Sequence, residues 1–250
     1  MTYNVHACVG TDRARDVERI AKVIGSYEPD VVALQEVDVH AAADNHIDQA
    51  ARLSELTGYD MHFSATRRCE KGQFGNLILS KLPFECVGEG TLPVRFGETR
   101  AAHRVRLLLD ERLAIELVNT HLSIHFFERM PQIRAIFADD ETTVTERVVP
   151  ELSFSPIRGP TDLLIVCGDL NAGSWSPVYR WFLKRLHDVQ GNRKSRALAT
   201  WPSYFPLLRL DHIWLGRRII AEAVAVPRTP LTLRASDHLP LIADLRIVDS

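Results

Sequence analysis

The chain has 250 residues, of which 46% are hydrophobic and 25% are charged, and its formal net charge is -2. These values are typical of a soluble globular protein. The length allows one large domain or two small ones, and we expect a single domain over residues 1–250. The slightly negative charge argues against a strongly basic nucleic-acid-binding surface, although it leaves room for a local basic cleft.

Apolar runs and cysteines exclude several further classes. No apolar run reaches the roughly 18 residues of a membrane span, and the N-terminus lacks the regions of a signal peptide, so we expect a cytoplasmic protein or one trimmed of its leader. We also expect a monomer. The four cysteines are Cys8, Cys69, Cys86 and Cys167. No pair has CxxC spacing, which argues against a zinc cluster, and their low density argues against a disulfide framework. Cys8 and Cys167 are expected to be small buried hydrophobes.

The first half of the chain predicts mainly strands. Tyr3–Val9 alternates at strand period, and Asp12 is a suitable N-cap for a helix that ends at about Tyr27. Thr66–Gly72 is interpreted as an exposed basic loop. The other elements predicted here are strands at Val31–Leu34, Tyr59–Ser64, Gly75–Ser80 and Phe84–Gly90, and a helix at Ile47–Leu56 that Gly58 closes.

The second half continues this pattern, with a variable connection at Glu141–Asp162 and a polar segment at Gly191–Ala199. Its predicted strands are Ala102–Leu109, Leu113–Thr120, Leu163–Cys167, Arg209–Leu215, Ile219–Val226 and Leu239–Val248, and its predicted helices are Phe126–Asp140 and Pro177–Leu186. Strands outnumber helices and many follow one another as hairpins. The pattern predicts two mostly antiparallel sheets packed face to face, with helices outside.

The strand at Leu163–Cys167 is followed by a polar motif. Gly168 lets the backbone leave the strand in a conformation that larger residues resist. Asp169 and Asn171 are two residues apart, so in extended geometry their side chains point the same way. A strand end is a good position for a catalytic pair. The alternative interpretation is a turn with Asx chemistry.

Other polar residues occur at the ends of apolar strands. The full set is Asn4, Glu36, His121, Asp169, Asn171, Asp211, Asp237 and His238. Individually, Glu36 is more often a surface carboxylate, His121 a structural histidine, and Asp237 with His238 part of a turn. Their joint occurrence in one chain is much harder to attribute to chance.

The set resembles the endonuclease/exonuclease/phosphatase family of metal-dependent phosphoesterases. The motifs are Thr2–His6, Leu34–Val37, Gly75–Ser80, Asn119–Leu122, Gly168–Asn171, Arg209–Ile213 and Ser236–His238, all in the order of the family. The run Phe205–Asp211 is similar to one in bacterial members. The resemblance implies an α/β (α+β) fold of the DNase I-like type, a four-layer α/β sandwich.

The resemblance also implies a metal cofactor, Mg²⁺ or Mn²⁺, because both ions prefer oxygen ligands. Glu36, with Asn4 and Asp237, resembles the metal-binding cluster of the family. A bound cation neutralises the phosphate and the developing charge on the leaving oxygen.

The remaining motif residues match catalytic positions of the family. Asp169 matches the residue proposed to orient or deprotonate the attacking water, and Asn171 would hold that water or a phosphate oxygen. His238 matches a phosphate-contacting histidine, which Asp211 would orient and keep protonated. His121 matches a position that stabilises the transition state or protonates the departing oxygen.

Substrate contacts are less specific. Arg100 is a candidate for phosphate or structural contact. Trp201–Pro206 is interpreted either as a loop that packs its aromatics inward or as an aromatic wall, led by Trp201, for a base, sugar or lipid group. His6 stands where some nucleases of the family carry a carboxylate, which weakens an assignment as an abasic-site endonuclease.

The sequence thus predicts a Mg²⁺- or Mn²⁺-dependent phosphoric ester hydrolase that cleaves a phosphodiester or monoester by in-line attack of water. The alternatives are a nuclease specifically, acting on DNA or RNA, and an inactive binding scaffold. The fold does not identify the substrate, which could be a nucleic acid, a phospholipid or a small phosphoester. Specificity is expected in the segments Thr66–Phe74, His125–Met130, Glu141–Asp162 and Gly191–Phe205.

Overall fold

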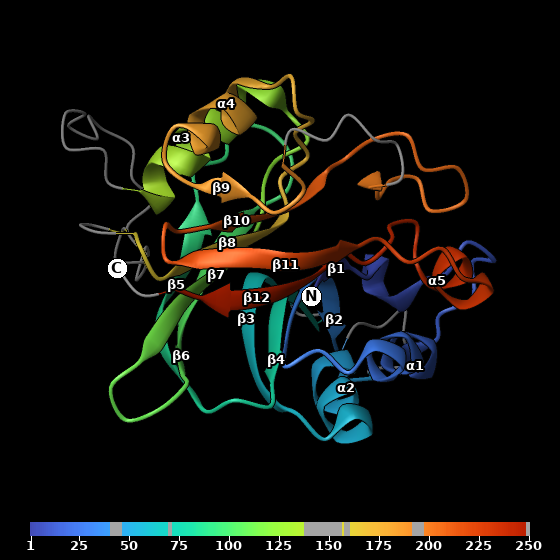
Figure 1. The fold of residues 1–250 in the computed structure, drawn as a ribbon. Coiled ribbons are helices and arrows are strands. Elements are labelled where there is room, and N and C mark those ends of the chain that lie inside the picture. The colour runs from blue at the N-terminus through green and yellow to red at the C-terminus, as the bar shows by residue number, and fades with distance from the viewer. Residues whose placement is uncertain (41–46, 70–71, 138–156, 158–160, 192–197, 249–250) are drawn as a thin grey trace.

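The protein is an α/β sandwich of four layers, with two β-sheets packed face to face and helices on both outer sides (Figure 1). This computed structural model describes all residues except 41–46, 70–71, 138–156, 158–160, 192–197 and 249–250. The predicted fold class is confirmed. The sheets are mixed and mostly antiparallel, since β1 and β2 pair parallel, as do β7 and β8, while the other pairs are antiparallel.

Two large sheets form the centre. The four-stranded sheet has the order β1-β2-β4-β3, made of β1 (Thr2–Asn4), β2 (Val31–Val39), β3 (Asp60–Cys69) and β4 (Gly72–Ser80). The six-stranded sheet has the order β5-β6-β7-β8-β10-β9, made of β5 (Phe84–Leu92), β6 (Arg100–Leu108), β7 (Ala114–His121), β8 (Leu164–Asp169), β9 (His187–Asp188) and β10 (Asp211–Leu215). A separate antiparallel ribbon joins β11 (Ile219–Ala225) and β12 (Ile242–Ile247).

Helices cover the outer sides of the sheets (Figure 1). The helices are α1 (Val17–Tyr27), α2 (Gln49–Thr57), α3 (Phe126–Ile136), α4 (Pro177–Leu183) and α5 (Pro230–Ala235), with a 3-10 turn η1 (His6–Cys8). In Figure 1, α1 and α2 lie beside the four-stranded sheet, and α3 and α4 lie over the six-stranded sheet.

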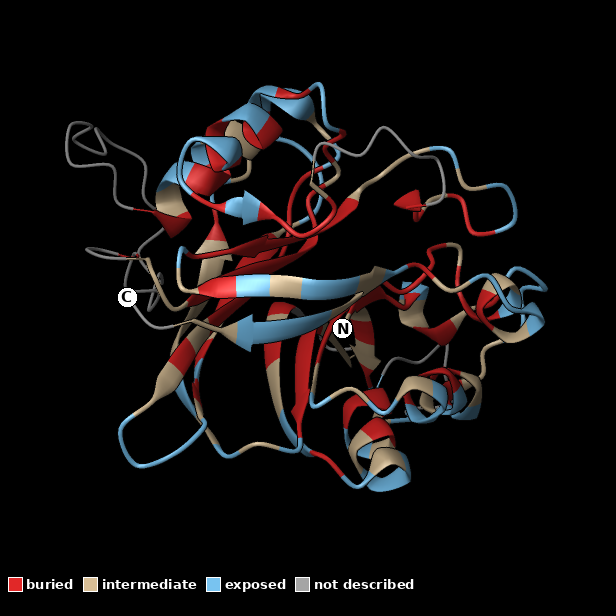
Figure 2. Ribbon diagram, viewed as in Figure 1, coloured by how far each residue is buried: buried red, intermediate tan, exposed pale blue. Residues whose placement is uncertain are grey.

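Three buried hydrophobic clusters fill the three spaces between the four layers. Ile20 and Leu53 pack α1 and α2 against the four-stranded sheet. Ile133 and Phe182 pack α3 and α4 against the six-stranded sheet. The third cluster lies between the sheets, where Ile78 of β4 is grouped with strands of the other sheet. Figure 2 shows buried residues along β8 and β10, and exposed residues on β11, β12 and the outer sides of the helices.

The beginning of the chain differs from its predicted structure. The first strand ends at Asn4, because His6, Ala7 and Cys8 adopt positive φ angles of 49°, 52° and 56° and form η1. The first helix begins later than expected. Its N-cap is Asp16, whose side chain accepts a hydrogen bond from the Arg19 backbone N–H at 2.9 Å.

Asp12, the predicted N-cap, instead forms ion pairs. It accepts from Arg19 Nη1 at 3.0 Å and from Arg234 Nε at 2.8 Å, and thereby joins α1 to α5. These ion pairs to side chains distant in sequence could not be inferred from helix-capping rules.

The predicted basic loop at Thr66–Gly72 is also wrong. β3 runs to Cys69 and β4 begins at Gly72, so the described part of this segment lies in two paired strands, and residues 70–71 lie outside the described residues. The charged residues there obscured the strand period. Two helices are shorter than predicted, because α3 ends at Ile136 and α4 at Leu183; the rest of the predicted helix to Asp140 lies outside the described residues. β9 and α5 were not predicted at all.

The described part of the chain contains no helix with the length and apolar character of a membrane span. Cys8 and Cys167 are buried, with 0% and 2% exposure, which confirms the predicted role as small hydrophobes. Cys8, Cys86 and Cys167 are free thiols.

Candidate active site

The predicted site residues come from strand ends that meet at one edge of the sandwich. Asn4 ends β1, His121 ends β7 and Asp169 ends β8. β10 runs antiparallel to β8, so its first residue, Asp211, pairs with the last residue of β8. Asp169 is therefore flanked in register by His121 on one side and Asp211 on the other.

A bulge directs Glu36 to the same place. The pairing of β2 with β4 shifts between Leu34 and Val37, and Glu36 takes a φ of 60° at this irregularity. A bulge reorients a side chain that regular alternation would place elsewhere. The side chain of Glu36 keeps 23% exposure, so its carboxylate is accessible from solvent.

The amide of Asn4 connects the two central carboxylates. Its Nδ2 donates to Glu36 Oε1 at 2.9 Å and to Asp169 Oδ2 at 3.1 Å, while its Oδ1 accepts from the His6 backbone N–H at 3.0 Å. Asn4 is 1% exposed. Both carboxylates thus face a single buried amide group, although they lie far apart in the sequence.

Asp169 and Asn171 form the predicted pair by a different geometry from the one expected. Asn171 has a φ of 47°, so the segment is not extended there. Its backbone N–H donates to Asp169 Oδ1 at 2.8 Å, which is the Asx-turn chemistry named as the alternative. The turn leaves Asp169 Oδ2 directed at Asn4. The turn interpretation is therefore confirmed, and the catalytic role of Asp169 stays a prediction.

Gly168 is required at the end of β8. Its φ is 137°, and a Cβ at this position would lie 1.8 Å from the carbonyl oxygen of Thr120, its partner in β7. Side chains other than glycine are strained in this region of φ and have no space here.

His121 contacts several site residues. Its Nε2 lies 3.0 Å from Asn171 Nδ2 and 3.5 Å from Asp169 Oδ2, and its Nδ1 lies 3.9 Å from Glu36 Oε1. Arg100 Nη1 lies 3.4 Å from Nδ1. Burial, together with the positive charges of Arg100 and His238, holds the pKa of His121 well below its usual range. His121 is therefore a neutral imidazole at neutral pH.

Asp211 and His238 form a buried pair. His238 Nδ1 lies 2.8 Å from Asp211 Oδ2, and His238 Nε2 lies 3.6 Å from Asp169 Oδ2. Burial lowers the pKa of His238, but the charges of Asp211 and Asp169 outweigh it and raise the pKa to about 10. The imidazolium form is thus favoured next to Asp169.

Burial has the opposite effect on Asp169. Its side chain is 2% exposed, and desolvation raises the pKa of Asp169 to about 7, against the opposing charge of His238. A carboxyl group with a pKa near neutrality can both accept and release a proton. Strongly perturbed groups that share a contact are typical of functional sites.

Asp237 and Trp201 lie beside each other at the margin of the site. Trp201 Nε1 donates to Asp237 Oδ2 at 3.4 Å, and Asp237 Oδ1 lies 3.7 Å from His6 Nδ1. The Asp237 side chain is 37% exposed. Ser236 ties the segment to β1, because its hydroxyl donates to the Asn4 carbonyl oxygen at 2.8 Å. The Asp237 side chain contacts His6, Ser236 and Trp201, and its predicted place in a metal cluster with Glu36 stays a prediction.

Sequence reasoning missed two supporting groups. Gln35 Nε2 donates to Asn119 Oδ1 at 2.8 Å, and Asn119 Nδ2 donates to the Leu34 carbonyl at 2.9 Å, which joins the two sheets beside Glu36. Gln35 and Asn119 lie within the family motifs of the sequence analysis, which assigned them no role. Arg129 of α3 is half-buried, and the charge of Asp169 acts on it; no sequence signal pointed to this cation.

The donor set fits a hard divalent cation. Glu36 offers an accessible carboxylate, and the Asp211 Oδ1 oxygen has no hydrogen-bond partner among the described residues. Asp169, Asp211 and His238 also offer ligand atoms within 4.8 Å of one another. Most of these ligand atoms are carboxylate oxygens, which Mg²⁺ and Mn²⁺ prefer.

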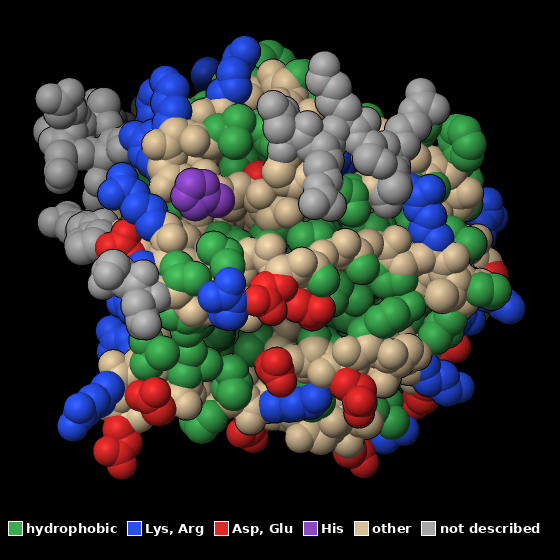
Figure 3. Space-filling view, viewed as in Figure 1, with side chains coloured by type: hydrophobic (Ala, Val, Ile, Leu, Met, Phe, Trp, Pro, Cys, Tyr) green, Lys and Arg blue, Asp and Glu red, His purple; other side chains and the backbone are tan. Residues whose placement is uncertain are grey.

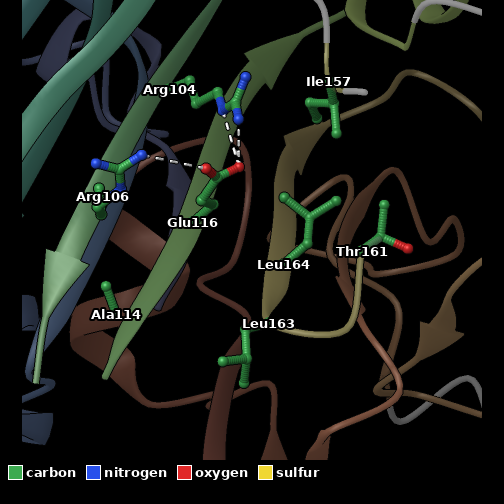
Figure 4. Close-up of a pocket in the computed structure, with 8 residues that line it drawn as sticks. All are labelled: Arg104, Arg106, Ala114, Glu116, Ile157, Thr161, Leu163 and Leu164. Atoms are coloured by element: carbon green, nitrogen blue, oxygen red, sulfur yellow. Dashed lines mark hydrogen bonds and ion pairs between the residues drawn. The ribbon is translucent and has the colours of Figure 1, made fainter. Parts of the chain in front are cut away.

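A pocket on another face has no part in this cluster (Figure 4). Its walls include Arg104 and Glu116, whose side chains are joined by a 3.0 Å hydrogen bond, together with Leu163 and Leu164. Glu116 is five residues before His121 on β7, so the strand alternation places the two on opposite faces of the sheet. The candidate active site is therefore the strand-end cluster.

The four-layer sandwich with this cluster at its strand ends defines a DNase I-like α/β protein. The model of the Endonuclease/Exonuclease/phosphatase family matches residues 1–238. The chain belongs to this family, which includes phosphatases, nucleases and phosphodiesterases.

Relatives cover nearly the whole chain. The uncharacterized protein YbhP of Escherichia coli K12 is 26% identical over 260 residues, which cover 99% of this chain and 95% of YbhP. The endonuclease/exonuclease/phosphatase of Beutenbergia cavernae has a TM-score of 0.74 and 23% identity over 98% of this chain and 70% of that one. A mannosyl-6-phosphatase of Bacteroides thetaiotaomicron has a TM-score of 0.69 and 18% identity over 98% of both chains.

Proposed function

We propose that the protein is a divalent-metal-dependent phosphoesterase that hydrolyses a phosphodiester or phosphomonoester by in-line attack of water. One observation carries the proposal: the amide of Asn4 holds the carboxylates of Glu36 and Asp169 together, with two histidines within 4 Å of these carboxylates. Burying acids in this way costs free energy unless they are paired or used. We infer a catalytic use for this arrangement.

Asp169 is the general base of the proposed mechanism. Its pKa of about 7 matches the pH at which a base is most effective. The hydrogen bond from the Asn171 backbone N–H fixes one oxygen, so the other can receive the proton of the attacking water. The side-chain amide of Asn171 is fixed by its contacts with His121 and the Leu122 carbonyl.

The two histidines differ in charge and therefore in role. His238, held in the imidazolium form by Asp211, binds the anionic phosphate and stabilises the charge that develops on it. His121 is neutral, so it offers the reacting phosphoryl group a polar imidazole rather than a full charge. The negative charge of a bound substrate raises its pKa and prepares it to protonate the departing oxygen.

Glu36 would hold the divalent cation, with Asn4 and Asp237 beside it. When bound, the ion supplies Lewis-acid neutralisation of phosphate charge. Arg100 lies behind His121 with 7% exposure, where it forms an ion pair with Glu98 at 3.4 Å. We assign Arg100 to positioning His121 and to the positive field of the site.

Five exposed aromatic residues lie near the site residues in sequence. Phe126 and Phe127 come shortly after His121, Trp175 follows Asn171, and Tyr204 and Phe205 precede Asp211. Their exposures are 78%, 46%, 68%, 73% and 61% respectively. Tyr204 and Phe205 do not pack inward, which favours the aromatic-wall interpretation of this loop. We propose a substrate that carries a ring or apolar group on its phosphate, as a sugar, base or lipid would.

A dedicated nuclease is the second candidate, and the surface charge speaks against it. On the face shown in Figure 3, Lys and Arg side chains are distributed around the margin and are mixed with Asp and Glu side chains over the lower half. In the described part of the chain, no continuous basic stripe crosses this face. Phosphate contacts dominate the affinity for long nucleic acids, so a compact phosphoester fits better.

Hydrolysis of bis-p-nitrophenyl phosphate with and without EDTA tests the proposal. We expect turnover with Mg²⁺ or Mn²⁺ and none in EDTA, with recovery when metal is restored. Turnover that survives EDTA would refute the metal mechanism. A protein that hydrolyses no member of a panel of sugar phosphates, phospholipids and nucleic acids would instead be a binding scaffold.

A further inference from the structure

A second group of ligand-type side chains lies away from the strand-end cluster. His62 of β3, Cys86 of β5 and His103 of β6 offer ligand atoms within 4.8 Å of one another. The two imidazole rings have centroids 4.6 Å apart at an interplanar angle of 40°. None of these residues belongs to the proposed phosphoesterase site.

The position of the group in the fold is unusual. β3 is the edge strand of the four-stranded sheet, and β5 is the edge strand of the six-stranded sheet. The three residues therefore bring both sheets together at one open edge of the sandwich. An edge strand has no partner strand on its outer side, so a row of its backbone groups is unpaired there.

Three buried ring nitrogens of this group have no hydrogen-bond partner among the described residues. His103 is 0% exposed, and none of the described residues forms a hydrogen bond with either of its ring nitrogens. The buried Nδ1 of His62 is likewise unpaired within the described residues. Buried polar groups in folded proteins are normally satisfied, and leaving them unpaired costs free energy. These nitrogens therefore indicate a missing partner.

The protonation state also suits a ligand. Burial, together with the charge of His62, lowers the pKa of His103 to about 3, so its imidazole is neutral and keeps a free lone pair. Cys86 is exposed at the surface, which provides an entry path. Burial of part of its side chain raises the pKa of the Cys86 thiol, so a bound ion must displace that proton to solvent.

The chemistry of the donors selects the ion. A thiolate with two imidazoles suits zinc and similar transition metals, whereas Mg²⁺ prefers oxygen ligands. Three protein ligands leave a fourth position, which water can occupy from the side of Cys86. The spacing rule that argued against zinc does not apply, because the ligands come from three separate strands.

We propose that His62, Cys86 and His103 bind a zinc-class transition-metal ion that ties β3 to β5 and β6. The ion would join the two sheets at this edge, and the site is independent of the ion that the phosphoesterase would use. The bound ion stabilises the folded chain because the unfolded chain does not hold these three residues together.

Cobalt substitution tests the proposal without reference to activity. The full chain is stripped of metal with EDTA and titrated with Co²⁺, and a thiolate-to-cobalt charge-transfer band in the near ultraviolet is monitored. The matched variants are Cys86→Ser and His62→Gln, with Glu85→Gln as the control because Glu85 is the exposed neighbour on β5. The active-site residues carry no thiol, so an ion bound there does not produce this band.

We expect the band in the wild type and in Glu85→Gln, and its loss in Cys86→Ser. Zinc should compete it away and raise the Tm of the wild type by roughly 5 °C or more at saturation. His62→Gln should weaken zinc binding by more than the roughly 10–100-fold typical of losing a supporting partner. Absence of the band in the wild type would overturn the proposal, and so would its persistence in Cys86→Ser, because another thiol would then bind the cobalt.

Discussion

At the scale of single residues, the two carboxylates of the site, Asp169 and Glu36, have different surroundings. Asp169 receives hydrogen bonds from Asn4 and from the Asn171 backbone, and His238 is its nearest cationic group. Glu36 differs, because it is partly exposed and reaches solvent. The two carboxylates therefore serve different purposes, with Asp169 suited to move a proton and Glu36 suited to hold an ion.

This division predicts the effect of Glu36→Ala. Losing a ligand weakens metal binding, so the Mg²⁺ concentration for half-maximal activity should rise by about 10-fold or more. The turnover number at saturating metal should fall far less. Metal titrations of hydrolysis measure both, with Glu55→Ala on the exposed side of α2 as the control. An unchanged metal requirement in Glu36→Ala would remove Glu36 from the metal site.

The pair of Asp211 and His238 predicts a pH dependence of stability. The pKa of His238 is raised from 6.5 to about 10 in the folded protein, against the opposing effect of burial. Its stabilising contribution is therefore fully present below pH 6.5 and is lost as the pH rises through about 10. Asp211→Asn should remove this contribution.

Urea unfolding in EDTA measures this effect. The free energy of unfolding of the wild type should exceed that of Asp211→Asn near neutral pH, and the difference should shrink above pH 10. A difference that stays constant across this range would show that His238 is not held as an imidazolium.

At the scale of elements, two backbone irregularities place the site. The bulge in β2 turns Glu36 toward Asn4, and the positive φ of Gly168 lets β8 end against Thr120. A regular β2 strand would direct the Glu36 side chain elsewhere. The geometry of the site is therefore fixed by how two strands end as well as by which residues they carry.

Gly168→Ala tests the second irregularity. The added Cβ would lie 1.8 Å from the Thr120 carbonyl oxygen at a φ of 137°, so we expect a loss of at least about 2 kcal/mol of stability. Gly25→Ala in α1 is the matched control, since a Cβ there has no atom within 4 Å and should stabilise by about 0.5–1 kcal/mol. Equal stabilities of both variants, measured by urea unfolding, would contradict the assigned constraint.

At the scale of the whole molecule, the layered fold was largely predictable from sequence. Apolar strands such as Val31–Leu34 and Leu163–Cys167 carry a clear period, and the order of strands and helices predicts a sandwich. The elements that escaped prediction depend on tertiary contacts. β9 is only two residues long. Asp12 forms ion pairs with Arg19 and Arg234 and does not cap the first helix.

Part of the site could also be predicted from sequence motifs, and the part that depends on tertiary contacts could not. Strand-end motifs indicated Asn4, Asp169 and His238, which the structure brings together. Sequence periodicity contains no information on bulges or on contacts between sheets. The bulge that turns Glu36 toward Asn4 and the role of Gln35 between the sheets could therefore not be inferred. The His62–Cys86–His103 group was hidden because its members lie on three strands of two sheets.

The central claim is that Asp169 is the base of a hydrolytic site, and the turnover number of Asp169→Asn tests it most directly. The variant keeps the shape of the side chain but removes its ability to accept a proton. With saturating Mg²⁺ and bis-p-nitrophenyl phosphate, we expect kcat to fall about 10²–10⁴-fold, while the exposed control Asp60→Asn keeps wild-type kcat and both variants keep the wild-type circular dichroism spectrum. A folded Asp169→Asn protein with near-normal kcat would contradict the account.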